Sequence, residues 1–146
     1  MKPTILLILF LGLISCGLND KFEIIGSSKL DSKNVAFSKD LALKIMEGQK
    51  SGHYYILNET EAETEMVKGL TSDLQKNSYE EISKMFGAFD SIQFTEAWRQ
   101  TNGDKNIIYR FKGYFNATTE HPEIRVVLSS KDKLTGFFIK PWNKTL

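Results

Sequence analysis

Among the side chains of this chain that could take part in proton transfer, those of His53, Asp90 and Tyr109 are the candidates for a catalytic site. Imidazole and carboxylate groups serve as general bases, and a tyrosine hydroxyl that faces the base stabilises the oxyanion formed in the reaction. An isomerase or a dehydratase would hold such a pair inside a pocket. Each residue also has an ordinary structural role, with His53 at the surface, Asp90 capping a turn and Tyr109 in a core. No known catalytic motif fits the three positions, so the sequence favours a protein that is not an enzyme.

Cys16, the only cysteine of the chain, occupies a position that indicates a specific modification. A single cysteine forms no internal disulfide, but its thiolate is a good nucleophile. Lys2 supplies a positively charged start, and residues 4–14 follow without a charge. This run has the length of a signal-peptide core and is too short to span a membrane. The run leads directly into the segment Leu13-Ile14-Ser15-Cys16.

That segment resembles the lipobox of bacterial lipoproteins, with an aliphatic residue three positions before the cysteine and a small residue directly before it. The resemblance implies that Cys16 is lipidated and that the signal peptide 1–15 is removed. We therefore expect a protein of the bacterial cell envelope that is anchored to a membrane by its lipid. Gly17 is not acidic, which favours the outer membrane over retention at the inner one. The alternative is an ordinary cleaved signal peptide, but Leu13 is bulky where that peptidase prefers a small side chain.

Composition argues against several other classes of function. The chain has 19 basic and 18 acidic residues and no dense basic stripe, so we expect no nucleic-acid partner. Glu59, Glu61, Glu63 and Glu65 supply oxygen ligands of the kind calcium prefers, but the glycine and terminal acid of an EF-hand are missing. A solvated loop before a helix is the favoured interpretation. Phosphate-binding loops and metal-ligand spacings are absent from the sequence, so we expect no cofactor and no metal.

The elements that would position these residues begin with helices. Apolar residues recur every four positions in 37–46 and again in 66–74, which indicates two amphipathic helices. Ser78 stands three residues before Glu81, a capping-box pattern that predicts a further helix ending at Gly87. The apolar piece 53–57 is expected to form a short strand or a helical turn.

Strands follow the helices, because the apolar period changes to two after Gly87. We expect four strands, with Ile92, Phe94 and Trp98 on one side of the first and a hairpin turn at Asn102-Gly103. Short connections between successive strands predict an antiparallel meander. The expected fold is α+β, with N-terminal helices packed on a curved four-stranded sheet. The chain then divides into the signal peptide (1–15), the lipidated cysteine with a polar tether (16–34) and the α+β domain (35–142). The tether contains a small apolar cluster of Phe22, Ile24 and Ile25, which leaves open one short strand-like piece there.

The outer face of this sheet is expected to be partly apolar. Tyr109 and Phe111 fall on the inner face, whereas Ile108, Tyr114 and Val127 fall on the outer one, between charged residues. A monomer seldom leaves such a patch unused. We therefore predict a homodimer paired through this face, with Tyr114 and Val127 near its centre. The alternative is that the tether, or the tail at Trp142, folds over the patch.

The order of elements resembles the nuclear transport factor 2-like superfamily, and within it small bacterial envelope proteins of unknown function. The resemblance is carried by a glycine-containing turn at Gly48–Gly52, the Tyr-rich piece Tyr54–Leu57, the Phe86-Gly87 helix end and the last strand, Leu134–Trp142. It implies a cone of helices packed into a curved antiparallel sheet, and a short helix at 54–57. The fold alone does not determine function, and the favoured hypothesis is a non-enzymatic module that binds a small apolar ligand or a protein partner. The alternative implied by the fold is an isomerase or dehydratase with a pocket between helices and sheet.

Overall fold

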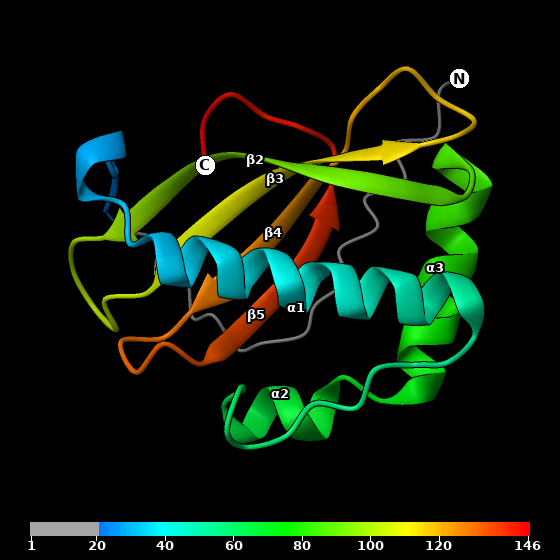
Figure 1. Ribbon diagram of the computed structural model, residues 1–146, viewed down its shortest axis with the longest axis horizontal. Coiled ribbons are helices and arrows are strands. Elements are labelled where there is room, and N and C mark those ends of the chain that lie inside the picture. Colours follow the sequence, from blue (N-terminus) through cyan, green and yellow to red (C-terminus); the bar gives the residue numbers. More distant parts are fainter. Residues whose placement is uncertain (1–20) are drawn as a thin grey trace.

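The computed structural model describes residues 21–146, so the lipobox and Cys16 lie outside the described residues. The helices are α1 (Ser32–Ser51), α2 (Thr64–Gly69) and α3 (Ser72–Phe86), with a short 3-10 helix η1 (Ser27–Lys29) before them. The strands are β1 (Phe22–Ile24), β2 (Phe89–Gln100), β3 (Ile107–Phe115), β4 (Glu123–Leu128) and β5 (Leu134–Lys140). Helix α1 crosses one face of a five-stranded sheet, α2 lies beside β5, and α3 packs against α1 at the end of the sheet (Figure 1).

The sheet is an antiparallel meander in the order β1-β2-β3-β4-β5, which confirms the predicted α+β class and strand connectivity. The predicted number of four strands was wrong. The additional strand, β1, lies in the segment predicted to be a polar tether, and it pairs with the end of β2 through Phe22↔Gln100 and Ile24↔Trp98. Phe22 and Ile24 alternate with Glu23, and β1 is the short strand-like piece that the sequence left open within the tether.

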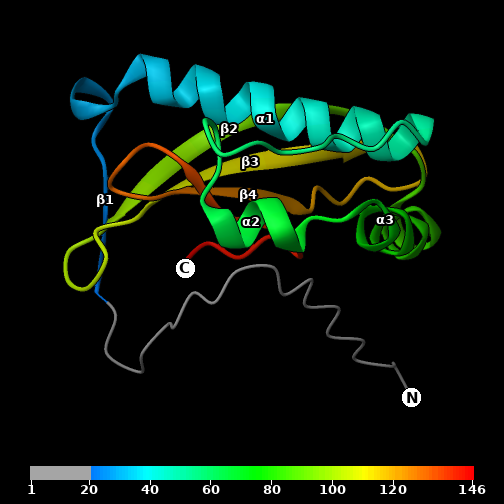
Figure 2. The same ribbon diagram turned by 90° about the horizontal axis from the view of Figure 1, so that it is seen from below.

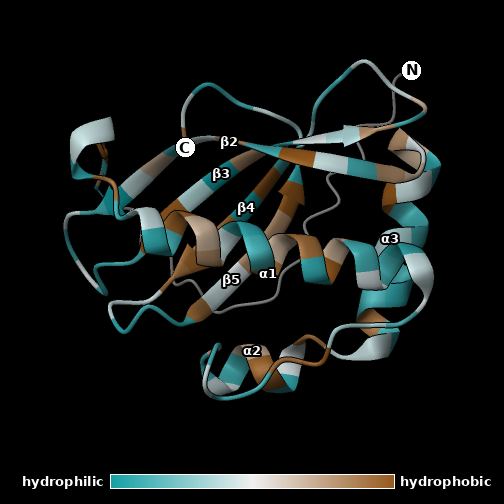
Figure 3. Ribbon diagram, viewed as in Figure 1, coloured by the Kyte–Doolittle hydropathy of each residue, from teal (hydrophilic) through white to brown (hydrophobic). Residues whose placement is uncertain are grey.

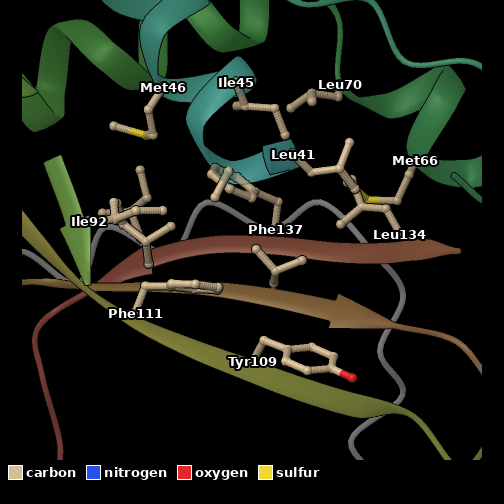
Figure 4. Close-up of a cluster of buried hydrophobic side chains, with 14 of the residues drawn as sticks. Leu41, Ile45, Met46, Met66, Leu70, Ile92, Tyr109, Phe111, Leu134 and Phe137 are labelled. Carbon is tan, nitrogen blue, oxygen red and sulfur yellow. The ribbon is translucent and has the colours of Figure 1, made fainter. Parts of the chain in front are cut away.

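Helix α1 lies along the sheet and supplies most of the helical side of the core. It starts at a cap in which the Asp31 carboxylate accepts a hydrogen bond of 2.9 Å from the Lys33 amide. It ends at Gly52, whose φ of 74° is the left-handed conformation that glycine adopts at low cost. Leu41 and Ile45 are completely buried on its sheet-facing side. Figure 4 shows them with Met66, Phe111 and Phe137, filling the space between helices and sheet.

The region between α1 and α3 differs from the sequence predictions in three ways. Residues 53–57 form neither a strand nor a helix but an extended loop, so the helix implied there by the family resemblance is absent. The helix predicted over 66–74 is broken at Leu70–Thr71. Helix α3 begins at Ser72, six residues before the expected cap at Ser78. The Thr71 hydroxyl caps α3 by accepting a hydrogen bond from the Leu74 amide, whereas Ser78 is buried within the helix and donates to the Leu74 carbonyl.

A bulge in β2 reverses the faces predicted for its second half. The register between β2 and β3 shifts between Phe94 and Glu96. Ile92 and Phe94 face the helices as predicted, but beyond the shift Ala97 takes the inner position and Trp98 turns to the outer face. The inner faces predicted for β3 and β4 are confirmed, since Tyr109, Phe111, Ile124 and Val126 are buried under the helices.

Candidate functional site at the outer face of the sheet

The structure does not bring His53, Asp90 and Tyr109 together. His53 is exposed just after the last turn of α1, and Asp90 is exposed at the start of β2, where it accepts a hydrogen bond from the Ser91 hydroxyl. Tyr109 lies beside Asn34 in the first turn of α1, at the opposite end of a 20-residue helix from His53. Such a helix is about 30 Å long, so these two side chains cannot act on one substrate atom.

Tyr109 is almost completely buried, and this burial raises the pKa of its hydroxyl to about 12. The negative charges of Asp31 and Asp132 add to the increase. The hydroxyl is therefore neutral near pH 7 and can donate a hydrogen bond. Asn34 beside it donates to the Asp132 carboxylate at 2.7 Å. The group joins the start of α1 to the β4–β5 turn, which is a structural arrangement.

The space between helices and sheet holds no general base among the described residues. Its buried polar side chains are hydroxyls and amides, including Ser38, Gln49 and Gln75. The Gln75 amide donates to the carbonyls of Tyr55 and Leu70 at 2.8 and 3.2 Å. The apolar side chains in Figure 4 occupy the interior around them. A pocket lined by described residues lies elsewhere, on the β3–β4 loop at Asn116–Glu120.

Ionisable groups gather instead on the outer face of the sheet, around Arg110 of β3 and Glu123 of β4. Both side chains are completely buried. Arg110 donates two parallel hydrogen bonds of 2.9 Å to Glu123, from Nε to Oε1 and from Nη2 to Oε2. This bidentate geometry is the strongest form of the carboxylate–guanidinium pair. Two full charges are thus buried on the face of the sheet opposite the apolar core.

Two further charged residues complete this group, which we call the outer-face cluster: Glu96, Arg110, Glu123 and Arg125. The strand register places Glu96, Arg110 and Arg125 in one row across β2, β3 and β4. Glu96 accepts hydrogen bonds from Arg110 Nη1 and, at 2.8 Å, from the Trp98 indole. Arg125 Nε donates to Glu123 Oε1 at 2.7 Å. Glu96 reaches Arg110 because the β2 bulge turns it to the outer face.

The C-terminal tail covers the cluster. Figure 2 shows the tail on the side of the sheet away from α1. The Trp142 ring stacks on the Arg110 guanidinium, with its centroid 4.4 Å from Cζ, and Arg110 Nη2 donates to the Asn143 carbonyl. Lys112 Nζ lies 5.7 Å from the same ring. Both tryptophans of the chain, Trp98 and Trp142, therefore contact this one group of charges.

The pairing sets the protonation states of the cluster. Burial alone would raise the pKa of Glu123, but hydrogen bonds from Arg110 and Arg125 outweigh it and hold this pKa below its ordinary value. Burial would likewise lower the pKa of Arg110, and Glu123 and Glu96 together raise it. Arg125 is the incompletely paired member, because its Nη2 is buried without a hydrogen-bond partner.

The apolar patch predicted on this face is not exposed. Ile108 and Val127 lie on the outer face as expected, but they are only 5% and 1% exposed. Tyr114 is half-buried, donates to the Gln93 side chain at 2.8 Å and packs on His121 with ring centroids 4.4 Å apart. Alternation had placed Arg110 and Arg125 on this face. Alternation did not identify their carboxylate partners. Glu96 reaches the outer face only through the β2 bulge, and Glu123 is the first residue of its strand.

The acidic run before α2 is part of the structure of its loop. The Glu61 carboxylate accepts hydrogen bonds from the Tyr55 hydroxyl at 2.9 Å and from the Asn58 amide groups. Glu63 accepts from the Ser129 hydroxyl at 2.8 Å. Within residues 21–146, no three metal-ligating side chains come close enough to share an ion. Over the same range, no helix has the length and apolar character needed to cross a bilayer.

No protein-family model, curated protein or solved structure matches this chain. The resemblance to the nuclear transport factor 2-like superfamily therefore stays a prediction. The α+β class and the antiparallel meander are observed directly, and the candidate site depends on the contacts of the outer-face cluster alone.

Proposed function

We propose that this protein is a lipid-anchored protein of the bacterial cell envelope whose α+β domain is a binding module rather than an enzyme. The observation that carries the anchor is the sequence of Cys16, with a charge-free run of signal-peptide length before it and a lipobox pattern around it. Outer-membrane attachment follows from Gly17 as part of the same proposal.

The binding role is supported by where the polar groups lie. The interior holds amides and hydroxyls among apolar side chains, whereas the charged groups are on the outer face. Proton transfer in a pocket between helices and sheet would need a base there, and the candidates His53 and Asp90 are exposed elsewhere. No observation favours the isomerase or dehydratase alternative.

The partner we propose is a protein that presents an acidic group to the outer face. Arg110, Lys112 and Arg125 face only two carboxylates of the cluster, so positive charge is in excess there. The partly exposed side chain of Arg125 supplies a donor for the acidic group. The ring of Trp142 beside it supplies flat apolar area, which is common at interface centres.

Metabolic labelling with palmitate tests the anchor. The parent chain is expected to incorporate the label and to be cleaved before Cys16, whereas Cys16→Ser is expected to stay uncleaved and unlabelled. The thiol is required because only its sulfur receives the diacylglycerol in this pathway. Equal labelling of parent and variant would refute lipidation at Cys16.

Photo-crosslinking in cells tests the binding face. A crosslinking residue in place of Gln93, exposed on β2 beside Tyr114, is expected to capture a protein partner. The same residue in place of Lys50, exposed on α1, is the matched control and is expected to capture none. Adducts from Lys50 alone would place the binding surface on the helical side instead.

A further inference from the structure

The described chain enters the fold at a fixed point beside the β2–β3 hairpin. The Lys21 amide donates to the Asn102 side chain at 2.8 Å, and the Lys21 carbonyl accepts from the Thr101 amide at 2.8 Å. Strand β1 then continues with ladder pairs to β2, and the Ile25 amide donates to the Ala97 carbonyl at 2.9 Å. Residues 21–34, predicted to belong to the tether, are therefore held in the fold.

This early start leaves a short connection to the proposed lipid. Between Cys16 and Phe22 there are five residues, and a fully extended chain of that length reaches about 20 Å. The predicted tether of 16–34 would have allowed the domain to move freely above the bilayer. A connection of five residues instead holds the hairpin end of the domain close to the membrane. This step rests on the proposed lipidation of Cys16.

Charge is distributed unequally along the long axis of the domain. We call the end that contains Lys21 the anchor end, made of residues 21–35, 99–107 and 129–133, and the opposite end, made of 47–53, 80–90 and 116–121, the distal end. Both ends can be followed in Figures 1 and 2, with the anchor end at the left. The anchor end has seven basic and four acidic residues, and the distal end has two basic and five acidic residues.

The surface of the anchor end suits a lipid headgroup layer. Its turns are hydrophilic (Figure 3), and Lys21, Lys29, Lys105 and Lys131 are exposed there. Ile24, beside the point of entry, is 55% exposed and is one of the large apolar side chains that the described surface leaves open to solvent. Basic side chains near a bilayer are attracted by anionic headgroups, and acidic ones are repelled.

We propose that the anchor end of the domain rests on the anionic membrane surface, with the distal end pointing away from it. The short connection brings this end to the bilayer, and its excess of basic side chains holds it there. An inverted domain would place the acidic distal end in that field, which disfavours the inverted orientation. The outer-face cluster then lies on the flank of the standing domain, where a partner can reach it.

Energy transfer from the lipidated full-length protein to the membrane tests this orientation. Lipidation blocks Cys16, so one introduced cysteine is the single site for a donor dye. Asp104→Cys labels the anchor end, and Thr119→Cys labels the distal end; both positions are exposed. In vesicles of phosphatidylethanolamine and phosphatidylglycerol with acceptor-labelled headgroups, we expect several-fold greater transfer from position 104. Equal transfer, or greater transfer from position 119, would overturn the orientation.

Charge reversal tests the electrostatic part with the same readout. The pair Lys29→Glu and Lys131→Glu, both exposed, is expected to reduce the difference in transfer between the two dye positions. Lys84→Glu at the distal end is the matched control and is expected to leave the difference unchanged or to increase it. An unchanged difference in the first variant would refute attraction by these lysines.

Failure of the anchor is distinguished by flotation. Lipidated protein that floats with the vesicles but shows equal transfer from both positions overturns the orientation and leaves the anchor intact. Protein that carries no lipid and does not float overturns the anchor, and the orientation with it.

Discussion

Arg110 and Glu123 show that a buried charged residue depends on its hydrogen-bond partners. A guanidinium with no exposed surface needs an acceptor for its donors, and Arg110 finds Glu123, Glu96 and the Asn143 carbonyl. Replacing such a pair with apolar residues is often neutral, whereas removing one partner leaves a buried charge without compensation. The two carboxylates could not be assigned to Arg110 from the sequence, because they are 14 and 13 residues away on two other strands.

The first prediction concerns the loss of one partner. Arg110→Ala is expected to lower the free energy of unfolding by about 3–5 kcal/mol, since it removes the bidentate partner of the buried Glu123 and leaves the hydrogen bond from Arg125 Nε in place. Urea denaturation followed by circular dichroism measures the change. Lys84→Ala, which removes an exposed partner of Glu81, is the control and is expected to leave the midpoint unchanged. Equal effects of the two substitutions would show that the pair contributes no more than a surface ion pair.

The second prediction concerns pH. The pKa of Glu123 is lower in the folded state than in the unfolded chain, so its contribution to stability is complete above the ordinary glutamate pKa of about 4.3. That contribution is lost as the pH falls through the lower, folded-state pKa. The unfolding free energy of the parent should therefore decrease below about pH 4 more steeply than that of Glu123→Gln, which has no carboxylate to protonate there. Parallel pH profiles for parent and variant would contradict this assignment.

At the scale of elements, periodicity predicted what local sequence determines and missed what depends on partners. The long stripe of α1, the helix end at Gly87 and the inner faces of β3 and β4 followed from spacing. Strand β1 has three residues and is stable only because β2 extends far enough to pair with it. The β2 bulge changes the face of Trp98 without changing the alternation of residue types. Pairing with β2 brings residues 22–24 into the sheet, and the β2 bulge brings Glu96 to Arg110 in the outer-face cluster.

The third prediction tests the turn that returns the chain along α1. A Cβ at Gly48 would lie 2.8 Å from the His53 carbonyl oxygen and 3.0 Å from the Tyr55 nitrogen, both backbone atoms. Gly48→Ala is therefore expected to destabilise the domain by about 1–3 kcal/mol, despite the better helix propensity of alanine. Gly26→Ala is the matched control, because nothing lies within 4 Å of its Cβ position. A melting temperature unchanged in Gly48→Ala would show that the loop after α1 yields at little cost.

The molecule as a whole has two different faces on one sheet, which explains why its candidate site could not be located by motif. One face is an apolar core under α1, and the other is a set of buried charges under the C-terminal tail. The sequence identified the fold class from the first face, because apolar spacing is a local signal. The second face requires the register of three strands and the position of a tail more than thirty residues from Arg110. Cys16, the reactive position predicted from sequence, could be found without the strand register or the tail position, and its lipidation stays a prediction.

The last prediction concerns the mass of the molecule in solution. A homodimer was expected from an open apolar patch centred on Tyr114 and Val127, but Val127 is buried and Trp142 of the same chain lies over Arg110. Because Ile108 and Val127 are buried and the tail lies over Arg110, the described surface lacks the open apolar patch through which a second copy was expected to pair. A soluble form that starts at Gly17 is therefore expected to scatter light as a monomer.

The same soluble form tests the role of the tail. Trp142→Ala, which removes the ring from the Arg110 guanidinium, is expected to lower the unfolding midpoint, whereas Lys144→Ala, at an exposed tail position, should not. A dimeric mass for the parent that falls to the monomer value in Trp142→Ala would instead support the homodimer and place the tail in its interface.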